Sequence, residues 1–345
     1  MKLFVTGVEG YIGCLLAPYL QARGHDLVGL DTGFYRDGWL FSDRRLVPGF
    51  PRTLNRDIRQ VQPEDLAGVE AVVHLAELSN DPLGANDPEL THEINHQASV
   101  RLAELARAAR VPRFVYTSSC SVYGVADGEQ AMSESSPTQP QTAYARCKTL
   151  VERDVGALAD DQFSPTFLRN ATAYGASPRM RFDIVLNNLC GLAATTGRIV
   201  MTSDGTPWRP LVHVLDICEA VACALDAPRD AIHGEVFNVG HDKDNYQVRE
   251  IAGIVAETFP GCELTFGPAG GDNRSYRVSF DKIHAKLPGF RCQWDARKGA
   301  QQLKEVFERI GLDPAGFEAR PFTRLKQLRY LQQTGQVDAA LFWKS

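Results

Sequence analysis

The amino-acid sequence predicts an α/β fold with a doubly wound parallel sheet. Two observations support this prediction. Short apolar runs alternate with helical patterns through the first half of the chain, and three glycines follow the first run at intervals of three residues. Strands that alternate with helices form βαβ units, which place their strands parallel within one sheet. The crossovers between such strands are expected to be right-handed.

The elements of the first half follow from the period and length of the apolar patterns. The run at 3–5 predicts a buried strand, and the pattern at 11–23 predicts a helix. Further strands are expected at 27–30, 71–75, 113–117 and 166–168, and further helices at 88–109 and 143–158. Residues 33–55 carry few regular signals and are expected to form a surface loop.

Beyond about Gly175 the alternation loosens, which predicts a smaller mixed α/β lobe. Strands are expected at 199–201 and 236–238, and helices at 182–194, 214–225, 248–259, 297–310 and 322–333. We therefore predict a first domain over residues 1–175 and a second lobe over 176–345. Segments of the second lobe are expected to interleave with the first domain.

The composition argues against several classes of function. The 345 residues carry a formal net charge of −5, which attracts neither nucleic acid nor an anionic membrane. No run reaches the roughly 18 apolar residues of a membrane span, and the first residues lack the pattern of a signal peptide. The eight cysteines include no CxxC pair, so we expect reduced thiols, no metal site and a cytoplasmic protein.

The stretch VTGVEGYIG joins the first strand to the first helix and predicts a dinucleotide site. Gly7, Gly10 and Gly13 permit a tight turn and close approach of a pyrophosphate to the helix N-terminus. The sheet is therefore expected to be Rossmann-like. Asp31 ends the second strand, where a carboxylate accepts hydrogen bonds from ribose hydroxyls and favours NAD over NADP. Arg36 lies close by in the sequence, so NADP stays an alternative cofactor.

Tyr144 and Lys148 lie four residues apart on a predicted helix and therefore share a face. A phenol titrates near pH 10, so its use as a base near neutrality needs about 4 kcal/mol of stabilisation of the anion. One cation about 4 Å away supplies roughly that amount at an effective dielectric of ~20. Lys148 is one such cation, and oxidised nicotinamide would be another. Ser119 ends the preceding strand, where its hydroxyl can donate to a substrate oxygen or relay a proton.

These motifs together resemble the extended short-chain dehydrogenase/reductase family, and specifically its nucleotide-sugar epimerases and dehydratases. The resemblance covers nearly the whole chain. It is carried by TGVEGYIG, Asp31, RDI at 56–58, VVHLAE at 72–77, Asn95, SSCSVYG at 118–124, YARCK at 144–148, NNL at 187–189 and RPLVHVLD at 209–216. The resemblance implies bound NAD, a Ser/Tyr/Lys catalytic site and a nucleoside-diphosphate sugar bound between two lobes.

The resemblance also implies which residues contact each ligand. Catalysis is expected from Ser119, Tyr144 and Lys148. Cofactor contacts are expected from Gly7, Gly10, Tyr11, Ile12, Gly13, Asp31, Asp57, Ile58, Leu75, Ala76, Asn95, Ser118, Tyr144, Lys148 and Asn170. Substrate contacts are expected from Glu77, Ser119, Cys120, Ser121, Thr172, Asn188, Arg209 and Arg274.

Two positions depart from the family pattern. Thr172 stands where many relatives carry an asparagine, and Glu77 stands where many carry a small residue. Both could alter how the sugar is held. Glu77 is interpreted as a partly solvated carboxylate, with a role as an extra acid or base as the alternative.

The residues after Ser119 separate the reactions of this family. Members that eliminate water carry an Asp–Glu pair there, and this chain has Cys120 and Ser121. An elimination needs a positioned acid, so the sequence predicts a 4-epimerase that oxidises and re-reduces C4. A dehydratase, another lyase or a ketoreductase remains an alternative, as does a catalytically silent NAD-binding scaffold. The helices at 88–109 and 143–158 are expected to form a homodimer interface.

Overall fold

A seven-stranded parallel sheet forms the centre of the computed structural model, which describes residues 1–42, 51–125, 130–269 and 275–344. Its strand order is β10-β6-β5-β4-β1-β2-β3, with every neighbouring pair parallel. The strands are β1 Lys2–Thr6, β2 Asp26–Asp31, β3 Arg52–Asn55, β4 Ala71–His74, β5 Arg113–Ser119, β6 Ser164–Asn170 and β10 Val236–Val239. The predicted doubly wound α/β class is confirmed.

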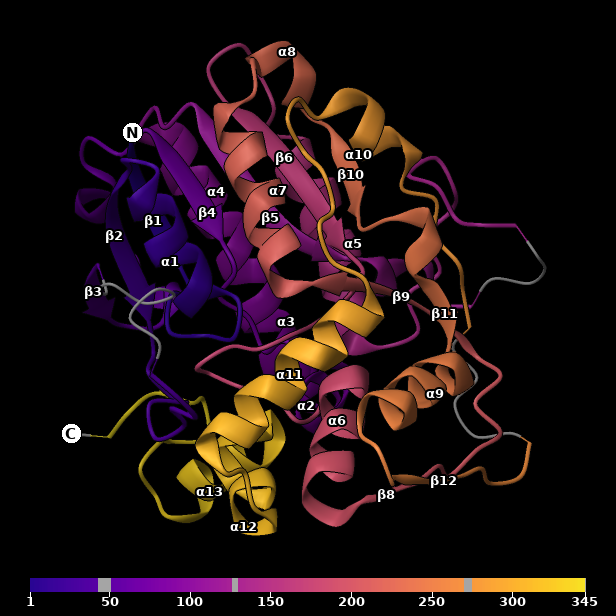
Figure 1. Cartoon of the computed structure of the whole chain (residues 1–345). Coiled ribbons are helices and arrows are strands. Elements are labelled where there is room, and N and C mark those ends of the chain that lie inside the picture. The colour runs from indigo at the N-terminus through magenta and orange to yellow at the C-terminus, as the bar shows by residue number, and fades with distance from the viewer. Residues whose placement is uncertain (43–50, 126–129, 270–274, 345) are drawn as a thin grey trace.

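Helices cover both faces of this sheet (Figure 1). On one face, α1 Gly13–Ala22 and α7 Val214–Asp226 pack in a core with Leu3 and Val5. On the other face, α4 Ala98–Ala108 and α5 Ala143–Gly156 pack in a second core with Phe4. Successive side chains of a strand point to opposite faces, so β1 contributes to both cores.

The remaining elements lie mostly at the carboxyl edge of the sheet. One small sheet has three strands, β7 Thr172–Tyr174, β9 Trp208–His213 and β11 Asn245–Gln247. A second has two strands, β8 Arg198–Val200 and β12 Glu263–Thr265. The other helices are α2 Asp81–Asn86, α3 Pro88–His92, α6 Val185–Thr196, α8 Arg229–Ile232, α9 Val248–Thr258, α10 Asp281–Lys286, α11 Ala296–Ile310, α12 Pro314–Glu318 and α13 Arg324–Gln333. Short 3₁₀ turns lie at Ile58–Gln60, Pro63–Leu66, Cys120–Tyr123, Asp242–Asp244 and Arg320–Phe322.

Two details differ from the sequence-based expectations. The predicted loop at 33–55 contains β3, an edge strand whose partly exposed residues give no apolar alternation. The predicted helix at 88–109 contains a π-helical turn, Glu93–Gln97, between α3 and α4. β10, from the second half of the sequence, pairs with β6 in the central sheet, which is the kind of interleaving that the sequence predicts.

Candidate active site

A cavity of about 620 Å³ lies at the carboxyl ends of the central strands and extends to residues of α6, β9 and α9. Ligands of open α/β sheets bind at this edge. Among the lining residues, Gly7 follows β1 and Asp31 ends β2. Ser119 ends β5, and Asn170 ends β6. Arg209 of β9 Trp208–His213 and Pro207, just before that strand, also line the cavity. The cavity therefore reaches from the glycine loop to β9.

The glycine loop leaves no room for side chains. Gly7 has φ +75°, and a Cβ atom there would lie 2.9 Å from the Ala76 nitrogen. A Cβ on Gly13 would lie 2.0 Å from the Gly7 oxygen. Both glycines are thus required by the turn, which carries the chain to the N-terminus of α1. Backbone N–H groups and the helix dipole there suit a pyrophosphate.

Asp31 is fixed beside this loop at the end of β2. Its carboxylate oxygens accept backbone N–H groups from Glu9, at 3.0 Å, and from Gly33, at 2.8 Å. Burial raises the pKa of the Asp31 carboxyl, and these hydrogen bonds oppose that effect. Arg36 is the residue that kept NADP, with its 2′-phosphate, as an alternative cofactor. Its guanidinium forms a bidentate ion pair with Glu9, at 2.6 and 2.8 Å.

Tyr144 and Lys148 lie on the first turns of α5. Thr142 begins this helix by accepting the Ala145 N–H at 3.1 Å, and its hydroxyl donates to Asp81 at 2.5 Å. The Lys148 ammonium lies 5.4 Å from the centre of the Tyr144 ring. Both residues line the cavity, as their four-residue spacing predicts.

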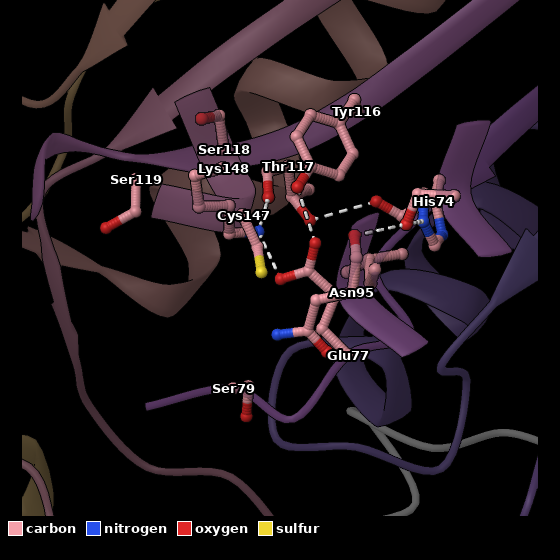
Figure 2. Close-up of polar contacts among 12 residues, drawn as sticks. His74, Glu77, Ser79, Asn95, Tyr116, Thr117, Ser118, Ser119, Cys147 and Lys148 are labelled. Atoms are coloured by element: carbon pink, nitrogen blue, oxygen red, sulfur yellow. Dashed lines mark hydrogen bonds and ion pairs between the residues drawn. The ribbon is translucent and has the colours of Figure 1, made fainter. Parts of the chain in front are cut away.

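Lys148 is held by a carboxylate that the sequence did not place (Figure 2). Its ammonium lies 2.6 Å from Glu77 Oε2 and donates to the Thr117 carbonyl at 2.5 Å. The Tyr116 hydroxyl donates to the other Glu77 oxygen at 2.5 Å. The Glu77 side chain is only 2% exposed, so its interpretation as a partly solvated carboxylate is wrong.

This pair alters the electrostatics expected for Tyr144. Burial raises the pKa of the Tyr144 phenol, and Glu77 and Asp81 raise it further. Arg181 and a hydrogen bond with Ser119 act in the opposite direction. Of the two cations expected to stabilise the Tyr144 phenolate, Lys148 is paired with Glu77, whose carboxylate acts in the opposite direction.

Most of the predicted contact residues line the cavity. Those that do so are Gly7, Gly10, Tyr11, Ile12, Gly13, Asp31, Asp57, Ile58, Leu75, Ala76, Glu77, Ser118, Ser119, Ser121, Tyr144, Lys148, Asn170, Thr172 and Arg209. Several of their side chains bind other groups of the protein. The Ser118 hydroxyl donates to Glu152 at 2.5 Å, and the Asp57 carboxylate binds Arg59 at 2.8 Å.

Three predicted residues do not line the cavity. The Cys120 thiol is buried against the Arg169 carbonyl at 3.1 Å, because the turn after β5 directs it into the core. Asn188 donates to the Phe182 carbonyl at 2.9 Å, which anchors α6. Asn95 bonds both the N–H and the carbonyl of Leu78, so it fixes the loop that carries Glu77. Arg274 lies outside the described residues.

The cavity residues that were not predicted include three charged side chains. Arg181 lines the cavity and pairs with Asp183, a second lining residue, at 2.9 Å. Arg324 reaches the cavity from α13, near the end of the chain. No local motif marks Arg324, whereas the charged pair Arg181 and Asp183 lies two residues apart and could have been noted.

The dinucleotide cradle, the strand-end aspartate and the Ser/Tyr/Lys group define an enzyme that performs hydride chemistry with a bound nicotinamide dinucleotide. The model of the NAD dependent epimerase/dehydratase family matches residues 3–240, and the chain belongs to this family. The resemblance drawn from the motifs is confirmed, and the cofactor is NAD.

Relatives and solved structures extend this similarity. A UDP-glucose 4-epimerase of Corynebacterium glutamicum is 30% identical over 272 residues, which cover 74% of this chain and 80% of the relative. MoeE5, solved with UDP-glucose and NAD, matches with TM-score 0.74 and 29% identity over 90% of this chain and 99% of its own. DesIV, a dTDP-glucose 4,6-dehydratase from Streptomyces venezuelae solved with NAD and TYD, gives TM-score 0.75 and 25% identity, over 90% and 97%.

The residues present fit NAD. The glycine loop lines the cavity, and the buried Asn170 Oδ1 and Ser121 Oγ have no hydrogen-bond partner. These unsatisfied atoms lie in the cavity wall, where a ligand could satisfy them. In the described ranges, no group of His, Cys, Asp and Glu side chains is arranged to hold a metal ion. No described helix combines the length and apolar character needed to cross a bilayer.

Proposed function

We propose that the protein is an NAD-dependent nucleotide-sugar epimerase that inverts C4. The observation that carries this proposal is the chemistry next to Ser119. Cys120 is buried away from the cavity, and Ser121 faces it with a hydroxyl. Neither can act as the acid that a dehydration needs. The Glu77 carboxylate is tied to Lys148, so it is not free to protonate a leaving group.

Each catalytic group has a defined task in this reaction. Tyr144 removes the O4 proton, and Ser119 hydrogen-bonds the same oxygen. NAD, held at the glycine loop and Asp31, would supply the hydride acceptor and donor for the two faces of C4. Tyr144 then returns the proton to O4, so no water is lost and the cofactor is regenerated. Thr172 and Arg209 line the cavity and are proposed to hold the sugar and the diphosphate, respectively.

The proposed function is tested with a panel of UDP-, dTDP-, GDP- and CDP-sugars, with products identified by NMR. An inverted C4 centre without loss of water is the expected result. Release of water from any substrate would favour the dehydratase alternative. Net consumption of reduced cofactor would favour a ketoreductase. No turnover of any substrate, and no transient NADH absorbance, would favour a silent NAD-binding scaffold.

Arg324 is proposed as a further ligand of the cofactor phosphates. The residue is 2% exposed and takes part in none of the ion pairs found among the described residues. It donates to the carbonyls of Pro321 and Arg179, each at 3.1 Å. Burial, together with the nearby charge of Arg181, lowers the pKa of Arg324 to about 10. A buried cation in the cavity that holds the glycine loop suits an anionic ligand.

We expect Arg324→Met to weaken binding of NAD and of ADP-ribose by about 10- to 100-fold, because charge-assisted hydrogen bonds contribute ~1.5–3 kcal/mol. Titration calorimetry would measure both affinities. Adenosine, which lacks phosphates, should bind the variant as it binds the wild type. Arg329→Met, an exposed substitution on the same helix, is the control. Equal losses for adenosine and NAD would contradict a phosphate contact.

We propose that the chain forms a homodimer through α4 and α5, which pack side by side on one face of the sheet. Sedimentation equilibrium at micromolar concentration should give twice the chain mass of 38.1 kDa. A monomer under these conditions would contradict the interface. We also propose a reducing, cytoplasmic setting, because all eight cysteines are unpaired.

A further inference from the structure

The Glu77 carboxylate is built into the wall of the active site. Its backbone follows β4, and Asn95 fixes the next residue, Leu78, through two hydrogen bonds of 2.8 and 3.1 Å. Figure 2 shows the Glu77 side chain between Lys148 and Tyr116. Both of its oxygens contact these partners, at 2.6 and 2.5 Å. Glu77 therefore has one defined position, set by groups from three separate segments.

The pair with Glu77 changes what Lys148 can do. Glu77 and the Thr117 carbonyl together fix the direction of the ammonium. An ammonium has three N–H donors, so one remains for a ligand in the cavity. The electrostatic effects of Glu77 and Lys148 on the Tyr144 phenol therefore largely cancel.

The other charged groups around Tyr144 do not replace the missing positive charge. Asp81, on α2, adds negative charge near the phenol, and Arg181 adds positive charge from the segment before α6. Ser119, at the end of β5, contributes a hydrogen bond. Burial adds to the cost of a phenolate. The protein alone thus favours the neutral phenol.

We propose that Glu77 is a positioning residue that aims the Lys148 ammonium into the cavity while cancelling its charge, so that Tyr144 becomes a base only with oxidised cofactor bound. The proposal rests on the epimerase function given above. Tyr144 would take the O4 proton while the cofactor is cationic. It would hold that proton firmly once hydride transfer has removed the cationic charge.

The test is a tyrosinate absorbance titration of the NAD-loaded protein. The chain has ten tyrosines, so the Tyr144 signal is taken as the difference from the same protein carrying Tyr144→Phe. We expect Glu77→Gln to lower the apparent pKa of Tyr144 by roughly one to two pH units, because a nearby negative charge is removed. Glu77→Asp, which keeps the charge, should titrate close to the wild type. Reduction of the cofactor should raise the apparent pKa in the wild type.

Glu152→Gln is the matched control. Glu152 is a buried carboxylate on the same helix as Tyr144 and is paired with Arg169 at 2.6 Å. Its substitution should leave the Tyr144 titration unchanged. If Glu77→Gln and Glu152→Gln shift Tyr144 equally, or if Glu77→Gln shifts it upward, the proposal is wrong. It is also wrong if reduction of the cofactor leaves the wild-type titration unmoved.

The activity profile gives an independent readout. A base is active only when deprotonated, so turnover falls as the pH drops through its pKa. A lower pKa in Glu77→Gln should move this acid limb to lower pH by the same one to two units. The titration needs no substrate. A shift of the apparent pKa of Tyr144 without turnover of any sugar would support the role of Glu77 and contradict the epimerase function. Turnover of a sugar without this shift would support the epimerase function and contradict the role of Glu77.

Discussion

Replacement of Tyr144 by phenylalanine is expected to lower kcat by about 10³-fold, because a positioned general base contributes roughly 10²- to 10⁴-fold. The variant loses only the hydroxyl that receives the O4 proton. The phenyl ring still fills the space beside Lys148, whose ammonium lies 5.4 Å from the ring centre. Affinity for NAD should therefore remain unchanged. Turnover of the substrate found in the sugar panel, together with NAD titration, measures both quantities.

Tyr330→Phe is a suitable control for this experiment. Tyr330 lies on α13, and its ring is covered by the Arg320 guanidinium at 3.6 Å, a contact that phenylalanine preserves. Its turnover should match the wild type. Substantial activity in Tyr144→Phe would remove Tyr144 from its role as the base. A parallel loss of NAD binding would instead indicate damage to the site.

The parts of the site that were predictable from the sequence are those fixed by local geometry. The glycine spacing marks the turn into α1, and the four-residue spacing of Tyr144 and Lys148 places both on one face of α5. Ser119 and Asp31 end parallel strands, so the sheet itself brings them to one edge. Each of these inferences needs only neighbouring residues and the order of the strands.

The parts that were missed depend on side-chain direction or on distant segments. Cys120 and Ser121 are adjacent, yet the 3₁₀ turn sends one into the core and the other into the cavity. The direction of Glu77 is set by a loop that Asn95 holds from the π-helical turn. Arg324 enters the cavity from the last helix, and no pattern near it in the sequence indicates this.

The Glu77–Lys148 pair also makes a prediction about stability. We expect Lys148→Met to lower the free energy of unfolding by about 3–5 kcal/mol, because removing one partner leaves a buried charge unpaired. Chemical denaturation of the cofactor-free protein would measure this loss. Lys148→Met combined with Glu77→Gln should recover most of it, because the double variant leaves no buried charge at this position. The matching pair Arg169 and Glu152 stays intact in every variant and helps hold α5 against β6.

The pH dependence of the single variant identifies the group responsible. In Lys148→Met the folded-state pKa of Glu77 is expected to rise, because burial raises the pKa of this carboxyl and the opposing cation is gone. A raised folded-state pKa means that stability is retained at low pH. It is then lost as the pH climbs from about 4.3, the ordinary glutamate value, to the folded-state value. The double variant should lack this loss. Two results would show that Glu77 is not the charge that Lys148 balances. One is that the losses in free energy of unfolding from the two substitutions add, and the other is that the single variant is equally unstable at pH 4 and pH 8.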